Sequence, residues 1–122
     1  MVSTLSEISK QAIKPFLNLC KREIKKGNYI FINTRLVKVN GKYISASKAL
    51  IDIGIFKEKE IWKYILNLEE KDCIDVSNDY DSKRDFNTEM YEFIIYINGK
   101  KVYIKLTYRN KVVCLSFHES NY

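Results

Sequence analysis

The last part of the chain holds residue types that could cut a phosphodiester without a metal ion. Tyr103 and Lys105 lie in one segment, Ser116 and His118 lie in the next, and Arg109–Asn110 separates the two. His118 is the only histidine, and a side chain that titrates near neutral pH suits a general acid or base. Lys105 or Arg109 could offset charge on a phosphate, and Tyr103 could donate to a phosphoryl oxygen or stack on a base. We therefore take His118, Tyr103 and Lys105 as candidate catalytic residues for RNA cleavage.

Each of these three residues also has a simpler explanation. His118 could be a strand-end histidine that meets solvent, and Tyr103 could be a tyrosine at the rim of a sheet. Lys105 could serve only to pair with Glu92 across two strands.

Two turns predict how the strands that carry these residues pair. If Arg109–Asn110 forms a two-residue turn, the register of its hairpin is set. The signal Asn98–Gly99 predicts a second hairpin just before it. The predicted pairs are Tyr103 with Ser116, Lys105 with Cys114, Lys101 with His118, Ile94 with Tyr103, and Glu92 with Lys105. The result is a three-stranded meander.

The two faces of this meander differ in composition, because side chains alternate along each strand. One face is apolar and is expected to meet the core: Tyr91, Phe93, Ile95, Ile97, Val102, Ile104, Leu106, Tyr108, Val113, Leu115 and Phe117. The other face mixes acid, base, hydroxyl and thiol groups: Glu92, Ile94, Tyr96, Lys101, Tyr103, Lys105, Thr107, Cys114, Ser116 and His118. A face that only meets solvent would not need this mixture, so we expect a site there.

Helices are predicted before the meander. Their expected limits are a cap at Ser3 or Thr4 to Gly27, the cap Ser45 to Gly54, and about Lys57 to Asn67. Pro15 is expected to kink or divide the first helix. The segment 29–44, around Asn40–Gly41, predicts a short strand pair or an extended loop, and the polar segment 75–87 predicts a loop.

These patterns predict the α+β class, with N-terminal helices packed on a twisted antiparallel sheet that ends in the C-terminal meander. At 122 residues and 46% hydrophobic, residues 1–122 are expected to form a single domain. No apolar run approaches the ~20 residues of a membrane span, and no targeting signal is visible, so we expect a soluble protein with no membrane partner. Three widely spaced cysteines predict reduced thiols in the cytoplasm. One histidine and no cofactor motif predict neither a metal site nor a cofactor.

The formal net charge of +6 is unevenly distributed. Nine of the fifteen acidic residues fall between Glu69 and Glu92, which leaves the two ends of the chain basic. If folding brings these ends together, their field would suit phosphates. The residues predicted to bind RNA are Lys101, Arg109, Lys21, Arg22 and Lys25. The alternative is that the helical cluster is only a solvated face.

Several motifs resemble the MqsR family of toxins in order and spacing. They are Ala49-Leu50 with Gly54-Ile55, Ile65-Leu66-x-Leu68 with Asp72, Tyr91, Val102-Tyr103-Ile104-Lys105, and Ser116-Phe117-His118. The resemblance covers most of the chain after about residue 12, and the final hairpin is its most specific part. It implies a RelE-like fold and metal-independent cleavage of mRNA by the toxin of a type II toxin-antitoxin system, held in check by a cognate antitoxin. Tyr103 matches the family's catalytic tyrosine, and His118 takes the place of a catalytic lysine.

Two positions depart from the family pattern. Asp75 stands where the founding member has a lysine, and Thr88, beside Asn87, stands where it has a glutamine. Either Lys71 or Lys83 then substitutes, or the chemistry relies on the hairpin alone, and activity could be reduced or lost.

Two other functions therefore stay open. One is a non-catalytic binding module or inhibitor whose acidic stretch Asp72–Glu92 mimics a phosphate backbone. The other is a toxin relative that binds RNA or the ribosome without cutting.

Overall fold

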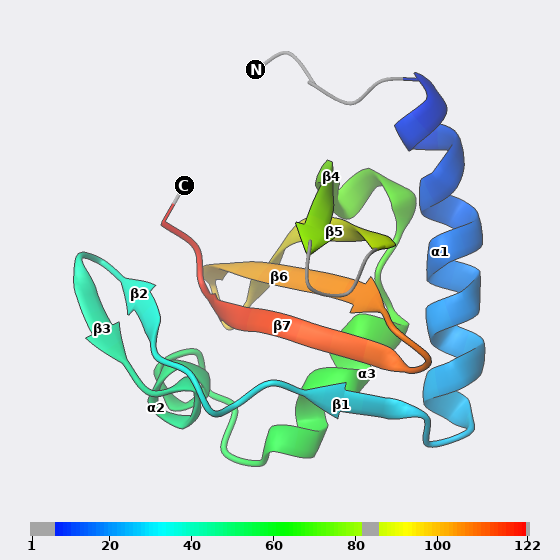
Figure 1. Ribbon diagram of the computed structural model, residues 1–122. Helices are drawn as coiled ribbons and strands as arrows, with labels where there is room; N and C mark the ends of the chain where they lie inside the picture. The colour runs from blue at the N-terminus through cyan, green and yellow to red at the C-terminus, as the bar shows by residue number, and fades with distance from the viewer. Residues whose placement is uncertain (1–6, 82–85, 122) are drawn as a thin grey trace.

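The computed structural model of the chain describes residues 7–81 and 86–121 (Figure 1). Its helices are α1 (Glu7–Lys25), α2 (Ala46–Asp52) and α3 (Ile61–Leu66), with 3-10 turns η1 (Glu58–Glu60) and η2 (Glu70–Asp72). One sheet has the order β1 (Tyr29–Phe31), β7 (Val112–Glu119), β6 (Lys100–Tyr108), β5 (Phe86–Ile97) and β4 (Cys73–Asp81). The strands β2 (Val37–Val39) and β3 (Lys42–Ile44) form a separate hairpin. The predicted α+β class is confirmed.

The sheet is mixed, so the prediction of an antiparallel sheet was wrong at one edge. β1 pairs in parallel with β7, with Phe31 beside Cys114. A parallel pair needs a long connection, and here that connection contains every element between β1 and β7. A pairing across more than eighty residues leaves no local pattern that a sequence argument could detect.

The segment 75–87, predicted as a loop, belongs largely to β4 and β5. These strands pair antiparallel from Cys73↔Phe93 to Asp81↔Phe86. Backbone hydrogen bonds hold such a ladder whatever the side chains are, and this polar stretch lacks the apolar alternation on which the prediction depended.

Helix α1 runs through Pro15 without dividing, contrary to the expectation. Its buried side chains follow the helical period and pack into the core, which keeps the helix in one piece: Ile13, Phe16, Leu17, Cys20 and Ile24. The helix ends at Lys25, two residues before the predicted Gly27, which has a φ of +81° in the turn where the Asn28 N–H donates to Glu23 O over 2.9 Å. The expected cap at Ser3 or Thr4 lies outside the described residues.

The helices predicted from Ser45 and from about Lys57 are confirmed, and so are the turns at Asn40–Gly41 and Asn98–Gly99. The Ser45 hydroxyl accepts from the Lys48 N–H over 3.1 Å at the start of α2, and the third helix begins as η1 and continues as α3. Asn40–Gly41 turns the β2–β3 hairpin, and Asn98–Gly99 turns β5 into β6, with positive φ at all four residues. Such turns match the twist of paired strands.

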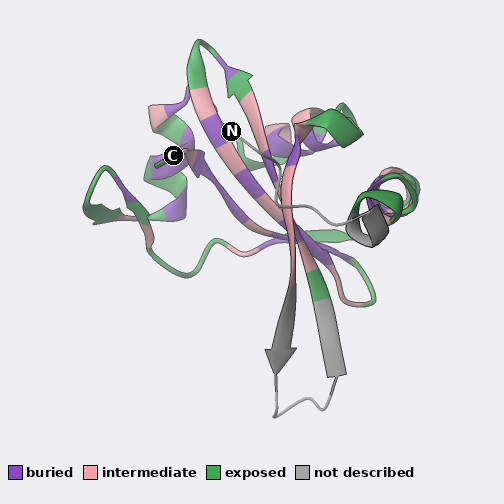
Figure 2. Cartoon of the chain, turned by 90° about the horizontal axis from the view of Figure 1, so that it is seen from above, coloured by how far each residue is buried: buried purple, intermediate pink, exposed green. Residues whose placement is uncertain are grey.

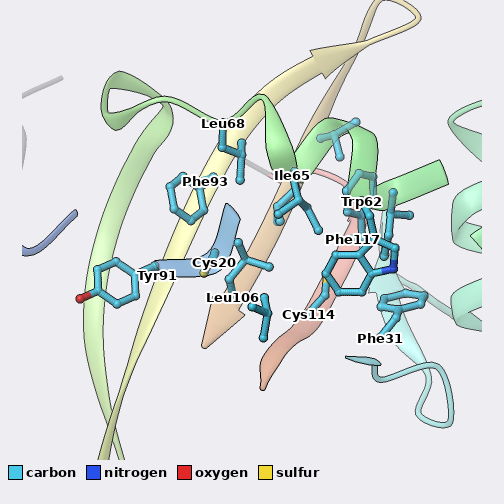
Figure 3. Packing of buried hydrophobic residues seen from close by; sticks show 14 of the residues in the cluster. Cys20, Phe31, Trp62, Ile65, Leu68, Tyr91, Phe93, Leu106, Cys114 and Phe117 are labelled. Carbon is cyan, nitrogen blue, oxygen red and sulfur yellow. The ribbon is translucent and has the colours of Figure 1, made fainter. Parts of the chain in front are cut away.

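The core lies between the helices and one face of the sheet. Its largest fully buried side chains include Phe93 and Phe117 (Figure 3). The Phe16 ring stacks on Tyr91 with 3.7 Å between ring centres. Trp62 is buried, as predicted. Figure 2 shows exposed residues on the outer sides of the helices and at the hairpin turns. The helices therefore cover the apolar sheet face and leave the polar face available for a site.

We expect Gly54→Ala to destabilise the protein more than Gly27→Ala. Both glycines have positive φ, +84° and +81°, so each alanine strains the backbone by roughly 1–2 kcal/mol. A Cβ at Gly54 would also lie 2.5 Å from Nδ2 of Asn98, which donates to Ile53 O, whereas a Cβ at Gly27 meets nothing within 4 Å. Loss of that hydrogen bond adds about 1 kcal/mol. Urea unfolding measures both free energies.

Asn98→Gly provides the control background, because glycine removes the amide and tolerates the positive φ at this position. In that background the two alanine substitutions should cost the same free energy. A difference that persists would contradict the role given to Asn98.

Candidate active site

The register of β6 and β7 differs from the predicted one in two places. Tyr108 pairs with Val112, so the loop has three residues instead of two, and the Arg109 N–H donates to Lys111 O over 3.0 Å. A bulge then shifts the register again between Lys105 and Leu106. The predicted two-residue turn at Arg109–Asn110 was therefore wrong.

Relative to the prediction, the first shift moves the side chains at the start of β7 to the opposite face of the sheet. The second shift returns the later side chains of β7 to their predicted faces. Cys114, predicted on the polar face, is fully buried in the core beside Leu106. Val113 and Leu115, predicted in the core, are not part of the core cluster. Beyond the bulge, Phe117 faces the core as predicted, and Ser116 and His118 lie on the polar side.

The shifts bring Tyr103 directly opposite His118, and Lys105 opposite Ser116. The rings of Tyr103 and His118 lie 5.4 Å apart, centre to centre, at an angle of 37°. On the other side, Tyr103 pairs with Ile94 and Lys105 with Glu92, as predicted. Two of the predicted catalytic residues are therefore in contact, and the third lies one position further along the same face.

A cleft of about 510 Å³ opens beside this pair. Its lining comes from the sheet, from the chain end, and from the segment that leads into the β2–β3 hairpin: Arg35, Leu36, Val37, Lys38, Tyr103, Ser116, His118 and Asn121. In Figure 1 this hairpin lies near the end of β7, on the opposite side of the molecule from α1. The cleft thus combines a histidine, a phenol and two cations.

The His118 imidazole is buried and favours its neutral form. Its side chain is only 8% exposed, and Nδ1 lies 2.8 Å from the Glu119 carbonyl oxygen. A carbonyl can only accept, so Nδ1 carries the proton, and the neutral ring keeps Nε2 free to take one. Burial lowers the pKa of His118, while the bond to Glu119 opposes that shift. The expectation of a strand-end histidine that meets solvent does not fit this burial.

Tyr103 donates its hydroxyl proton to Oε1 of Glu92. Glu92 lies opposite Lys105, one diagonal step from Tyr103 on the same sheet face. The carboxylate therefore holds the phenol in place, and a partner for the Tyr103 hydroxyl exists before any substrate binds.

The side of the cleft that the segment 35–38 and Asn121 form was not predicted from the sequence. We refer to it as the hairpin wall. The Arg35 Nη2 donates to Leu115 O over 3.0 Å. Asn121 holds the hairpin from the chain end: it accepts from the Asn40 N–H over 2.9 Å and donates to Lys38 O over 2.7 Å. The turn Asn40–Gly41 was a visible signal for the hairpin, but its position beside His118 depends on contacts across about eighty residues.

Only one of the predicted RNA-binding residues lies near the cleft. Lys101 is two residues from Tyr103 on the same face. Arg109 lies in the loop at the other end of the hairpin, about 20 Å from Tyr103 at the usual strand rise.

The three basic residues of α1 lie on the helix layer. Lys21 donates to Leu68 O over 2.9 Å, Arg22 lies 4.0 Å from Glu23, and Lys25 is exposed in the last turn. The end of α1 meets the loop of Arg109, because Asn28 Nδ2 donates to Asn110 O over 3.0 Å. Arg109 therefore lies in a loop that contacts the chain just after α1, away from the cleft.

Comparison with known protein families identifies the chain. The family described as motility quorum-sensing regulator, toxin of MqsA, matches residues 23–119. The chain belongs to the MqsR toxin family. It is thus a toxin of a toxin-antitoxin system, and the family implies an antitoxin partner. No curated protein and no solved structure gives a significant match.

The matched range contains most of the cleft, and only Asn121 of the lining residues lies beyond it. Asp75, the first departure from the family pattern, lies on β4 and pairs with Glu92 of β5. Oδ1 of Asp75 accepts from the Val76 N–H. Lys71 is exposed on η2, 3.9 Å from Glu69, and Lys83 lies outside the described residues. The cations that this toxin places in the cleft itself are Arg35 and Lys38.

Three further findings concern metal binding, membrane crossing and the reactivity of Cys114. No group of three or more His, Cys, Asp or Glu side chains in ranges 7–81 and 86–121 could hold a metal ion. No helix in the same ranges is long and apolar enough to cross a membrane. Burial raises the pKa of the Cys114 thiol, which keeps it protonated and unreactive.

We expect Asn121→Ala to loosen the β2–β3 hairpin of the toxin without unfolding the sheet. The substitution removes two hydrogen bonds, which should cost about 1–2 kcal/mol of local stability. Hydrogen exchange should accelerate at Val39 and Lys42 and stay unchanged in β5 and β6. Asn67→Ala is a matched control, because it removes an exposed asparagine bond to Lys63 O on α3. Equal exchange in both variants would contradict the role of Asn121.

Proposed function

We propose that this toxin is a metal-independent endoribonuclease that cleaves mRNA, with His118 as its general base. The observation that carries the proposal is a buried, neutral imidazole opposite Tyr103 in a cleft lined by Arg35 and Lys38. Family membership supports the toxin role, and the polar sheet face supports chemistry on a phosphate.

In the proposed reaction, Nε2 of His118 takes the proton of a ribose 2′-hydroxyl. The 2′-oxygen attacks the neighbouring phosphorus, and the bond from phosphorus to the 5′-oxygen of the next nucleotide breaks. Tyr103 gives its proton to that leaving oxygen and regains one from the imidazolium of His118, whose ring lies 5.4 Å away, centre to centre. The products are a 2′,3′-cyclic phosphate and a 5′-hydroxyl, and no proton is gained or lost by the enzyme.

The cations of the cleft suit the charge that develops on the phosphate. Arg35 and Lys38 line the cleft, and Lys105 lies one position beyond Tyr103 on the same face. Preorganised cations and donors near a pentacoordinate phosphorus are worth several kcal/mol of barrier. Glu92 holds the Tyr103 hydroxyl until the substrate arrives.

The proposed substrate and location are consistent with each other. mRNA is cleaved in the cytoplasm, and the free thiols of Cys20, Cys73 and Cys114 suit that reducing compartment. The ribosome is a further candidate partner, because it presents mRNA as a single strand.

We expect the purified toxin to cleave RNA in the presence of a chelator and to leave 2′,3′-cyclic or 3′-phosphate ends. His118→Ala should lower the rate by roughly 10²–10⁴-fold, the usual cost of losing a general base. Gel analysis and mass spectrometry of the fragments measure both quantities. Tyr103→Phe keeps the ring beside His118 and removes the hydroxyl, so it tests the proposed acid separately.

Circular dichroism must show that each variant is folded. A requirement for added magnesium or fragments with 3′-hydroxyl ends would refute the mechanism. RNA binding without any cleavage would instead favour the non-catalytic binding module.

The rate should rise with pH through a pKa below the ordinary value of a histidine. The base must be neutral, and burial lowers the pKa of His118, so the active form persists into mildly acidic solution. The same shift means that the unfolded chain binds this proton more readily, so folding stability falls as pH falls through the ordinary histidine range. His118 is the only histidine, so one NMR titration gives its pKa for comparison with the rate. An acidic limb at or above the ordinary value would contradict the assignment.

A further inference from the structure

Two exposed tyrosines lie next to residues that line the cleft, and each pairs with a lysine. Tyr43 is 67% exposed and Tyr96 is 70% exposed, although most large hydrophobic side chains of the described chain are buried. Tyr43 belongs to the hairpin wall, and Tyr96 belongs to the sheet. Neither ring contributes to the core cluster, so packing does not explain why they are aromatic.

Tyr43 shares a face of the hairpin with a residue that lines the cleft. It pairs directly with Lys38, so both side chains lie on one face of β2 and β3. The Lys38 ammonium lies 5.7 Å from the centre of the Tyr43 ring, and Lys38 itself lines the cleft. The ring and the cation therefore form one unit at the cleft edge.

Tyr96 lies on the same sheet face as Tyr103. It pairs with Lys101, while the next position on that face of β5, Ile94, pairs with Tyr103. Tyr96 and Lys101 are thus one step along the sheet from the phenol that borders the cleft. Tyr96 and Lys101 on the sheet therefore form a second tyrosine–lysine pair, in addition to Tyr43 and Lys38 on the hairpin.

We propose that Tyr43 and Tyr96 are stacking platforms for two unpaired RNA bases, one on each side of the cleft. The proposal rests on RNA as the substrate of the proposed function, and it identifies the substrate class as single-stranded RNA. An exposed aromatic ring binds any base by its flat face, and a neighbouring lysine binds the adjoining phosphate. Paired bases in a duplex keep these faces stacked on one another, so a duplex cannot use the platforms.

Binding of short 2′-O-methyl RNA oligonucleotides to the full chain tests the proposal, because the blocked 2′-oxygen prevents cleavage. Fluorescence anisotropy compares a single strand, its duplex, and a series that lacks one base at a time. Tyr43→Ala and Tyr96→Ala should each weaken single-strand binding roughly tenfold. Tyr43→Phe and Tyr96→Phe keep the ring and should bind like the unchanged protein.

The base-deletion series gives the sharper result. Removing one particular base should weaken binding to the unchanged toxin but should not weaken binding to Tyr96→Ala any further. Removing a different base should likewise weaken binding to the unchanged toxin but not to Tyr43→Ala. Phe56→Ala is the matched control, since Phe56 is 76% exposed and borders a separate pocket beside Leu50 and Ile51 that shares no lining residue with the cleft. It should leave binding unchanged.

Several outcomes would overturn the proposal: equal affinity for single strand and duplex, alanine variants that bind normally, or losses that do not depend on any base. Normal RNA binding by the alanine variants would assign the tyrosines to a protein partner instead. Tyrosine-dependent binding without cleavage of unmodified RNA would keep this inference and refute the proposed function. Cleavage without tyrosine dependence would do the reverse, and a toxin that neither binds nor cuts RNA would refute both.

Discussion

The candidate site depends on two one-residue shifts in the pairing of β6 with β7. Side chains alternate along a strand, so one shift turns every following residue to the other face, and a second shift turns them back. The three-residue loop sends Cys114 into the core, and the bulge returns His118 to the open face. With only one of the two shifts, His118 would point into the core and Phe117 toward solvent. The bulge is therefore a requirement of the site and not an irregularity of the strand.

The cleft depends equally on contacts between distant parts of the chain. The β2–β3 hairpin is short and would not be stable alone. Asn121 binds its backbone from the chain end, and Arg35 binds the carbonyl of Leu115 beside the bulge. The parallel pairing of β1 with β7 brings the chain to the edge where this hairpin begins. The same segment thus closes the cleft and supplies its cations.

Polar contacts orient the two rings of the cleft. Burial keeps the imidazole of His118 uncharged, and the Glu119 carbonyl orients it. Glu92 accepts from Tyr103, so the carboxylate is engaged on the sheet face and the phenol is oriented. Asp75 stands where the family pattern has a lysine, and the cations that line the cleft are Arg35 and Lys38.

The sequence by itself determined the elements that local patterns control. Ser45, Gly27 and the two Asn-Gly turns marked helix ends and hairpins, because capping and positive φ depend on a few neighbouring residues. The apolar alternation of β5 and β6 predicted their core face, and the Asn98–Gly99 turn predicted their register. Only the tertiary structure decided the loop and bulge of β7, the parallel strand β1, and the wall that carries Arg35 and Lys38. The pairing of β1 and the contacts of this wall join residues about eighty positions apart, and the free energy that selects them comes from packing and hydrogen bonds between elements, which no short stretch of sequence contains.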